Sequence, residues 1–106
     1  MDDERIVIVC YKPLEGKEEV LEALIRAHVD ILREEGLASD RPSIVMRAKD
    51  GTFLEVFAWK SKEAIEAAHF NPRVQKLWEE FAEICEYVPV AETEEAGHLF
   101  SEFSPI

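Results

Sequence analysis

The fold is decided by residues 52–81, which read TFLEVFAWKSKEAIEAAHFNPRVQKLWEEF. The opening segment TFLEVFAWK is apolar on both alternating faces, which is typical of a strand that is covered on both sides. Ser61 can then cap a helix that closes at His69. Asn71 and Pro72 read as an N-cap and a proline at the first helical position, so another helix should begin there. This stretch therefore predicts a strand followed by a helix that is broken near its middle.

The N-terminal part of the chain predicts a strand and a long helix. Residues 5–12 (RIVIVCYK) form an apolar run of strand length that ends before Pro13. Between Gly16 and Gly36, apolar residues recur at spacings of three and four, which indicates an amphipathic helix. His28 lies on the buried stripe of that helix.

A hairpin connects this helix to the stretch quoted above. Residues 43–49 form its first strand, and residues 52–60 form its second. Asp50 and Gly51 join the two strands, and this dipeptide favours a two-residue turn in which both residues have positive φ.

The segment after Pro72 predicts a helix and then a last strand. The apolar stripe of the helix extends to Cys85, and Pro89 ends the pattern. An acidic loop follows, and residues 98–104 (HLFSEFS) read as the final strand. The order β-α-β-β-α-β predicts a single α+β, ferredoxin-like domain over residues 1–106. Its four-stranded antiparallel sheet should carry the helices on one face.

Composition and charge narrow the classes of partner. The chain has 106 residues and a net charge of −11, so it should repel nucleic acid and anionic membranes. The first residues lack the basic and long apolar segments of a signal peptide, and no apolar run is long enough to cross a bilayer. We therefore expect a cytoplasmic protein. Cys10 and Cys85 are far apart and have no neighbouring cysteine, so two buried thiols are expected.

The predicted sheet has more apolar surface than two helices can cover. The helices cover one face of the sheet, and the other face should then be polar. In the strand at 52–60 one row is Phe53, Phe57 and Trp59, and the other is Leu54, Val56 and Ala58. Leaving the three aromatic side chains in water would forfeit several kcal/mol, at about 25 cal/mol per Å2. The alternative is that another segment of the chain covers this face, but only residues 104–106 are spare in the predicted order. We therefore expect a homodimer through the exposed sheet face, whichever of the two rows lies on it.

The same region resembles a known family. It contains, in order, an acidic residue in the third strand, an aromatic residue near the end of that strand, Ser-x-Glu-Ala, Ala-His and a proline-led helix. These are Glu55, Trp59, Ser61, Glu63-Ala64, Ala68-His69 and Pro72. The order is similar to that of the antibiotic biosynthesis monooxygenases, a branch of the dimeric α+β barrel superfamily. The resemblance implies a dimeric α+β barrel with an apolar cavity between sheet and helices.

The resemblance also implies an activity. Monooxygenases of this branch act on small aromatic or polyketide-like substrates without a metal or a flavin, so no cofactor is expected. The chain also lacks the glycine-rich motifs that bind nucleotides. The expected function is a cofactor-independent monooxygenase. The alternative is a non-catalytic small-molecule-binding or assembly protein on the same dimeric scaffold.

His28 and His69 are the candidate catalytic residues. A neutral His28 ring that faces the sheet could hydrogen-bond a substrate phenol or act as a general base. Alternatively, it is a core histidine held by a backbone carbonyl or water. For His69 the resemblance implies a place at the rim of the cavity, whereas its position also suits a C-terminal helix cap. A metal shared by both would need a further ligand, so none is expected.

Aromatic residues complete the expected site. Tyr11, Trp59 and Trp78 should shape the substrate pocket, although residues at such spacings also form cores. Glu55 is a carboxylate between two phenylalanines, and it need not converge with the histidines. It is either a general acid or base or, in the preferred interpretation, the partner of Arg47 or of a basic residue across the dimer interface.

Overall fold

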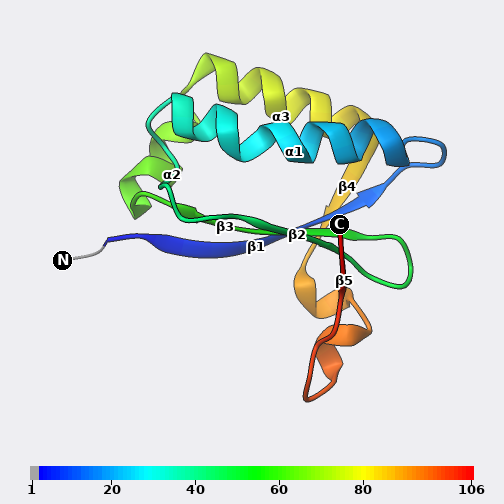
Figure 1. The fold of residues 1–106 in the computed structure, drawn as a ribbon. Coiled ribbons are helices and arrows are strands. Elements are labelled where there is room, and N and C mark those ends of the chain that lie inside the picture. Colours follow the sequence, from blue (N-terminus) through cyan, green and yellow to red (C-terminus); the bar gives the residue numbers. More distant parts are fainter. Residues whose placement is uncertain (1–2) are drawn as a thin grey trace.

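The computed structural model describes residues 3–106. It forms one antiparallel sheet of five strands, in the order β4-β1-β3-β2-β5, with all three α-helices on one face (Figure 1). The elements are β1 (Arg5–Pro13), α1 (Glu18–Glu34), β2 (Ile44–Arg47), β3 (Phe53–Trp59), α2 (Lys62–Ala68), α3 (Pro72–Ile84), β4 (Cys85–Val88), two 3₁₀ turns (Val90–Glu92 and Glu95–Gly97) and β5 (Ser104–Pro105). The predicted α+β class and the β-α-β-β-α-β order are confirmed, and the arrangement is roughly ferredoxin-like.

The number of strands and the C-terminal part of the chain differ from the prediction. The sheet has five strands and not four, because the fourth strand begins at Cys85, where we expected helix. Cys85 has an extended backbone (φ −154°, ψ 170°), and the strand that it starts pairs with the outer edge of β1. An unpaired edge of β1 would leave a row of backbone groups without partners, so this pairing is favoured over another turn of helix. The predicted strand at 98–104 is absent apart from Ser104, which pairs with Arg47 in the two-residue β5.

Three predicted helix boundaries are confirmed, at Ser61, Asn71 and Gly36. The Ser61 hydroxyl accepts the backbone N–H of Ala64, and Asn71 Oδ1 accepts two N–H groups in the first turn of α3. Gly36 ends α1 with a φ of +75°, a conformation that costs other residues more than glycine. These caps set the directions from which α1 and α3 cross the sheet.

The hairpin between β2 and β3 is present, but its turn is longer than predicted. In the described part of the chain only glycines have positive φ, so Gly51 adopts the left-handed conformation and Asp50 does not. Asp50 Oδ1 instead accepts the backbone N–H of Thr52 at 2.9 Å. The Ala48 N–H donates to the Thr52 carbonyl at 2.8 Å and closes the wider loop. The two-residue turn was therefore a wrong prediction, because the Asp50 side chain stabilises a local turn at negative φ.

The register of β1 against β3 decides which row faces the helices. Tyr11 pairs with Phe53 and Val9 with Glu55, so these side chains share one face. That face is the buried one, since the aromatic row of β3 packs in two core clusters with residues of the helices. The other row, which includes Leu54 and Val56, points away from the helices.

The face turned away from the helices is covered at one end by residues 89–103, which we call the C-terminal arm. In Figure 1 the arm is the orange and red segment that leaves the sheet on the side opposite the helices. Val90 and Phe103 of the arm pack against the buried Cys10 and Leu54. Our expectation that only residues 104–106 were spare to cover this face was therefore wrong.

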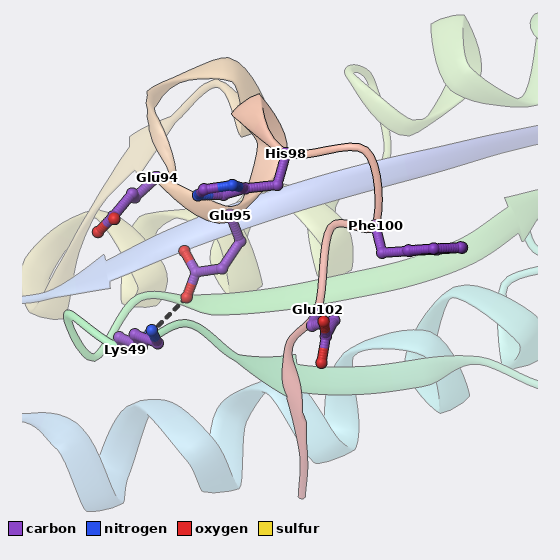
Figure 2. A pocket seen from close by; sticks show the side chains of 6 residues that line it. All are labelled: Lys49, Glu94, Glu95, His98, Phe100 and Glu102. Carbon is purple, nitrogen blue, oxygen red and sulfur yellow. Dashed lines mark hydrogen bonds between the residues drawn. The ribbon is translucent and has the colours of Figure 1, made fainter.

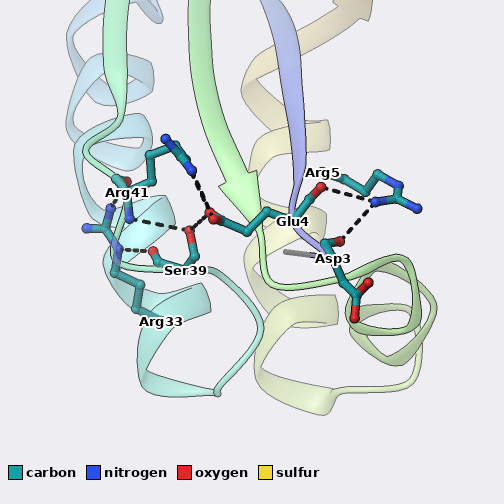
Figure 3. A network of polar contacts seen from close by, with 6 residues as sticks. All are labelled: Asp3, Glu4, Arg5, Arg33, Ser39 and Arg41. Atoms are coloured by element: carbon teal, nitrogen blue, oxygen red, sulfur yellow. Dashed lines mark hydrogen bonds and ion pairs between the residues drawn. The ribbon is translucent and has the colours of Figure 1, made fainter. Parts of the chain in front are cut away.

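A polar cluster closes the other end of the sheet (Figure 3). Arg41 donates two hydrogen bonds to the carboxylate of Glu4, at 3.0 and 3.2 Å, and the Ser39 hydroxyl donates a third. Arg33 donates to the backbone carbonyls of Ser39 and Arg41. Because these groups are partly exposed, each ion pair contributes at most about 1 kcal/mol. Together they tie the loop after α1 to the start of β1.

Candidate active site between sheet and helices

A cavity of about 270 Å3 lies between the sheet and the helices. Its lining residues come from five elements, and all but one carry a ring: Val9, Tyr11, His28, Phe57, Trp59, Trp78 and Tyr87. The structure thus brings together four predicted site residues, namely Tyr11, His28, Trp59 and Trp78. A cavity of this size lies at the lower end of ligand pockets, so it suits a small molecule.

The strand alternation and the helix stripe explain why these residues meet. Tyr11 of β1 and Trp59 of β3 occupy the row that faces the helices. His28 lies on the buried stripe of α1, between Ile25 and Leu32. Trp78 is partly buried and packs against both core clusters from α3. Each side chain is therefore fixed by a regular element and not by a loop.

A buried carboxylate holds the polar groups at one wall of the cavity. Glu55 Oε1 accepts a hydrogen bond from the Tyr11 hydroxyl at 2.8 Å and another from His28 Nδ1 at 2.8 Å. The Tyr11 oxygen lies 3.4 Å from the same nitrogen. Glu55 is only 1% exposed, and His28 is 3% exposed. Two donors converging on Oε1 offset part of the cost of burying the carboxylate, whereas Glu55 Oε2 is buried without a hydrogen-bond partner in residues 3–106.

This arrangement assigns the tautomer of His28. A carboxylate only accepts hydrogen bonds, so Nδ1 must carry a proton. In the neutral ring Nε2 then has a lone pair. Nε2 is buried and has no hydrogen-bond partner in residues 3–106. His28 itself lines the cavity, so its unpartnered Nε2 lies in a residue of the cavity wall.

The preferred interpretation of Glu55 was wrong. Its expected partner Arg47 lies with its guanidinium over the ring of Phe53, 4.6 Å from the ring centroid. The expectation that Glu55 need not converge with the histidines is also wrong for His28. Glu55 shares the row of Phe53, and that row faces α1, where His28 lies.

Aromatic rings fix the positions of Tyr11 and His28. The ring of Phe81 stacks on Tyr11 with centroids 4.9 Å apart, and it meets His28 edge-on at 5.3 Å. Phe57 contacts the His28 ring from another side, with centroids 5.5 Å apart. This apolar surround keeps water away from the carboxylate and strengthens its hydrogen bonds.

Burial changes the acidity of both tyrosines in the cavity. Desolvation raises the pKa of Tyr11 far above its ordinary value, and the charge and hydrogen bond of Glu55 raise it further. Desolvation also raises the pKa of Tyr87 to about 12, with smaller contributions from Cys85 and Glu55. Tyr11 therefore acts as a permanent hydrogen-bond donor to Glu55.

An alkaline titration tests this environment, because Tyr11 and Tyr87 are the only tyrosines in the chain. We expect no tyrosine ionisation near pH 10 in the folded protein, monitored by absorbance at 295 nm. In urea both should titrate at about pH 10. Because the folded state then holds more protons than the unfolded state, the free energy of unfolding should fall above pH 10 and be unaffected below it. Tyr87 is 52% exposed, so only ionisation of both tyrosines near pH 10 in the folded protein would contradict the buried position of Tyr11.

The two other histidines lie outside this cavity. His69 is exposed at the end of α2, where its ring meets Trp78 edge-on with centroids 5.2 Å apart. It does not line the cavity with His28, but it contacts a residue that does. His98 lies on the C-terminal arm.

Figure 2 shows the second hollow, to which His98 belongs. It measures about 370 Å3 and is lined by Lys49, Glu94, Glu95, His98, Phe100 and Glu102. Glu95 Oε2 accepts the backbone N–H of Lys49 at 2.8 Å, which anchors the arm to the hairpin loop. Across residues 3–106 no group of three or more His, Cys, Asp or Glu side chains is placed to hold a metal ion. Cys10 and Cys85 are free buried thiols, as expected.

Sequence reasoning missed three of the lining residues and the role of Glu55. Val9 lies two residues before Tyr11, and Phe57 lies two residues before Trp59. Each pair therefore shares one face of its strand, and this alternation could have identified Val9 and Phe57. Tyr87 could not be placed, because the change from helix to strand at Cys85 was not predicted. For Glu55 the available signal was its shared row with Phe53 and Phe57.

The described part of the chain contains no helix with the length and apolar character that a membrane span requires.

Comparisons with known proteins assign no family to this chain. The chain matches no known protein family, no curated protein and no solved structure.

Proposed function

We propose that this protein is a cofactor-independent monooxygenase, similar to the antibiotic biosynthesis monooxygenases, that acts on a small aromatic or polyketide-like substrate. The observation that carries the proposal is the Tyr11–Glu55–His28 group beside an aromatic cavity, with His28 Nε2 left without a partner. The residue order from Glu55 to Pro72 gives the family resemblance.

The cavity would bind the substrate mainly by apolar contact. Trp59, Trp78 and Phe57 offer ring faces and edges to a flat molecule, and such contacts favour aromatic ligands. His69 would act as a positioning residue, because its ring packs on Trp78. A hydroxyl group on the substrate would then reach Nε2 of His28.

His28 would act as the general base. Its Nε2 takes the proton from the acidic hydroxyl or C–H group of the substrate, and the positive charge that develops on the ring is stabilised by Glu55. Tyr11 holds the same Glu55 oxygen, so the carboxylate stays in place during the transfer. Glu55 and Tyr11 are positioning residues, because neither needs to touch the reacting carbon.

The reaction with oxygen balances without another reductant. For a substrate with an activated CH2 group, the carbanion left by proton removal gives electrons to O2 and forms a carbon–oxygen bond. The resulting hydroperoxide loses water and leaves a C=O group. The sum is CH2 + O2 → C=O + H2O, in which the CH2 carbon is oxidised and O2 is reduced.

The alternative of a non-catalytic binding protein predicts an apolar pocket without convergent polar groups. The buried group formed by Tyr11, Glu55 and His28 supports the enzyme instead, because burying a carboxylate and an imidazole together is costly for a purely apolar pocket.

The test is oxygen uptake with anthrone, an aromatic CH2 acid, as the probe. We expect the purified wild-type protein, without added metal or flavin, to consume one O2 for each anthraquinone formed. An oxygen electrode and mass spectrometry measure the two quantities, and a reaction without protein corrects for autoxidation. Anthrone binding, followed by tryptophan fluorescence, without oxygen uptake would overturn the monooxygenase and support the binding protein.

A further inference from the structure

Five aromatic side chains form most of the wall of the cavity between sheet and helices. They are Tyr11, Phe57, Trp59, Trp78 and Tyr87. The planes of Phe57 and Trp59 are inclined by 55°, with centroids 5.3 Å apart. Those of Tyr11 and Tyr87 are inclined by 50°, with centroids 5.6 Å apart. Inclined rings around a hollow are the arrangement of the aromatic cages that bind quaternary ammonium groups, because the face of each ring is negative.

A buried negative charge lies directly behind this wall. Glu55 Oε1 accepts hydrogen bonds from Tyr11 and His28, and both of these residues line the cavity. Oε2 of the same carboxylate is buried and has no hydrogen-bond partner in residues 3–106. The charge of Glu55 is therefore only partly compensated. Its field acts through one layer of side chains in an apolar surround, where attraction to a cation is stronger than in water.

No basic side chain offsets this field at the wall. The described residues that line the cavity include no lysine or arginine. Arg47 lies with its guanidinium over Phe53, which is not one of the lining residues. Trp78 and Tyr87 belong to residues 77–106, a segment that contains glutamates and no lysine or arginine. The net charge of −11 adds a long-range attraction for cations. An anionic ligand would thus lack a positive partner in the wall.

We infer that the cavity selects an aromatic substrate that carries a positively charged amine or quaternary ammonium group, and that it rejects the corresponding anion. This charge preference deepens the proposed function and rests on it in one respect, namely that the substrate binds in this cavity. A neutral molecule such as anthrone can still enter, because apolar contact does not depend on charge. It gains nothing from the field of Glu55 or from cation–π contacts with the rings.

The first test compares three probes that are similar in size: phenyltrimethylammonium, its neutral isostere tert-butylbenzene, and the anion benzenesulfonate. Trp59 and Trp78 are the only tryptophans in the chain and both line the cavity, so tryptophan fluorescence reports this site. The Kd of the cation should be lower than that of its isostere on the order of 10-fold, and benzenesulfonate should give no saturable change. Equal Kd values for cation and isostere, or no binding of the cation, would overturn the inference.

The second test removes the charge behind the wall. Glu55→Gln can keep the hydrogen bonds with Tyr11 and His28, but it carries no charge. It should raise the Kd of phenyltrimethylammonium on the order of 10-fold and leave that of tert-butylbenzene unchanged. Glu35→Gln, which removes a carboxylate away from the cavity, should bind both probes like the wild type. An unchanged Kd for the cation in Glu55→Gln would contradict the role of the buried carboxylate.

The binding and oxygen-uptake experiments can fail separately. A preference for the cation without oxygen uptake from anthrone would support the charge selection and overturn the monooxygenase. Oxygen uptake from anthrone without any preference for the cation would support the monooxygenase and overturn the charge selection. Displacement of bound phenyltrimethylammonium by anthrone would show that both occupy one site, and simultaneous binding of the two would contradict it.

Discussion

Replacing Glu55 with glutamine should lower kcat for anthrone oxygenation by about 10²- to 10⁴-fold and leave the fold intact. In the structure one oxygen of Glu55 accepts both the Tyr11 and the His28 hydrogen bonds. A glutamine carbonyl can occupy that place and accept both bonds, but it carries no charge. The imidazolium that forms as His28 takes a proton then loses its stabilising carboxylate.

The structural cost of this change should be small. An amide is cheaper to bury than a carboxylate, so the free energy of unfolding should fall by no more than about 1 kcal/mol. KM should change little, because Glu55 does not line the cavity. A loss confined to kcat is therefore the signature of a role in charge stabilisation.

Steady-state kinetics and urea unfolding of the same preparation measure both effects. Glu35→Gln is the matched control, since Glu35 is also hydrogen-bonded, to Asn71 and Arg73, but lies away from the cavity. The control should keep wild-type kinetics. Unchanged kcat in Glu55→Gln would show that the buried carboxylate serves the fold alone.

Replacing Phe81 with alanine should lower the free energy of unfolding by about 3–5 kcal/mol. Phe81 is fully buried and stacks on Tyr11 with centroids 4.9 Å apart, while its edge contacts the His28 ring. Removing the ring forfeits the free energy gained by transferring it from water into the core. It also leaves a cavity that the surrounding structure fills only in part. The free energy of unfolding of a single domain is roughly 5–15 kcal/mol, so this one substitution would remove a large share of the stability.

Urea denaturation at one fixed protein concentration measures this loss, because association would otherwise shift the midpoint. Phe70→Ala is the control: its side chain is 83% exposed, so its effect should stay within about 0.5 kcal/mol. Phe81→Leu should lie between the two and remain folded if the alanine variant does not. A loss below about 1 kcal/mol for Phe81→Ala would contradict the tight packing around Tyr11 and His28.

Much of the fold could be predicted because the ends of its helices are set by capping contacts between residues close in the sequence. Ser61, Asn71 and Gly36 end or begin helices through contacts within a few residues of themselves. The C-terminal part could not be predicted in this way. Cys85 continues the apolar spacing of α3, and only the pairing of the following residues with β1 makes it extended.

Individual residues of the candidate site could be predicted, but their arrangement around Glu55 could not. Alternation placed Tyr11 and Trp59, and the helix stripe placed His28, so these residues were found one by one. Alternation cannot say which of two apolar rows faces the helices. That choice decides whether Glu55 meets His28 or a partner chain, and it depends on packing between segments far apart in the sequence.

The most direct test of His28 as the catalytic base compares oxygen uptake with anthrone by the wild type, His28→Gln and His98→Gln. His98 lies on the arm, outside the cavity, so it controls for the loss of any histidine. We expect His28→Gln to lose at least about 100-fold in initial rate, because it lacks the base, and His98→Gln to keep the wild-type rate. Equal rates in all three proteins would contradict the assignment of His28 as the catalytic base of this cavity.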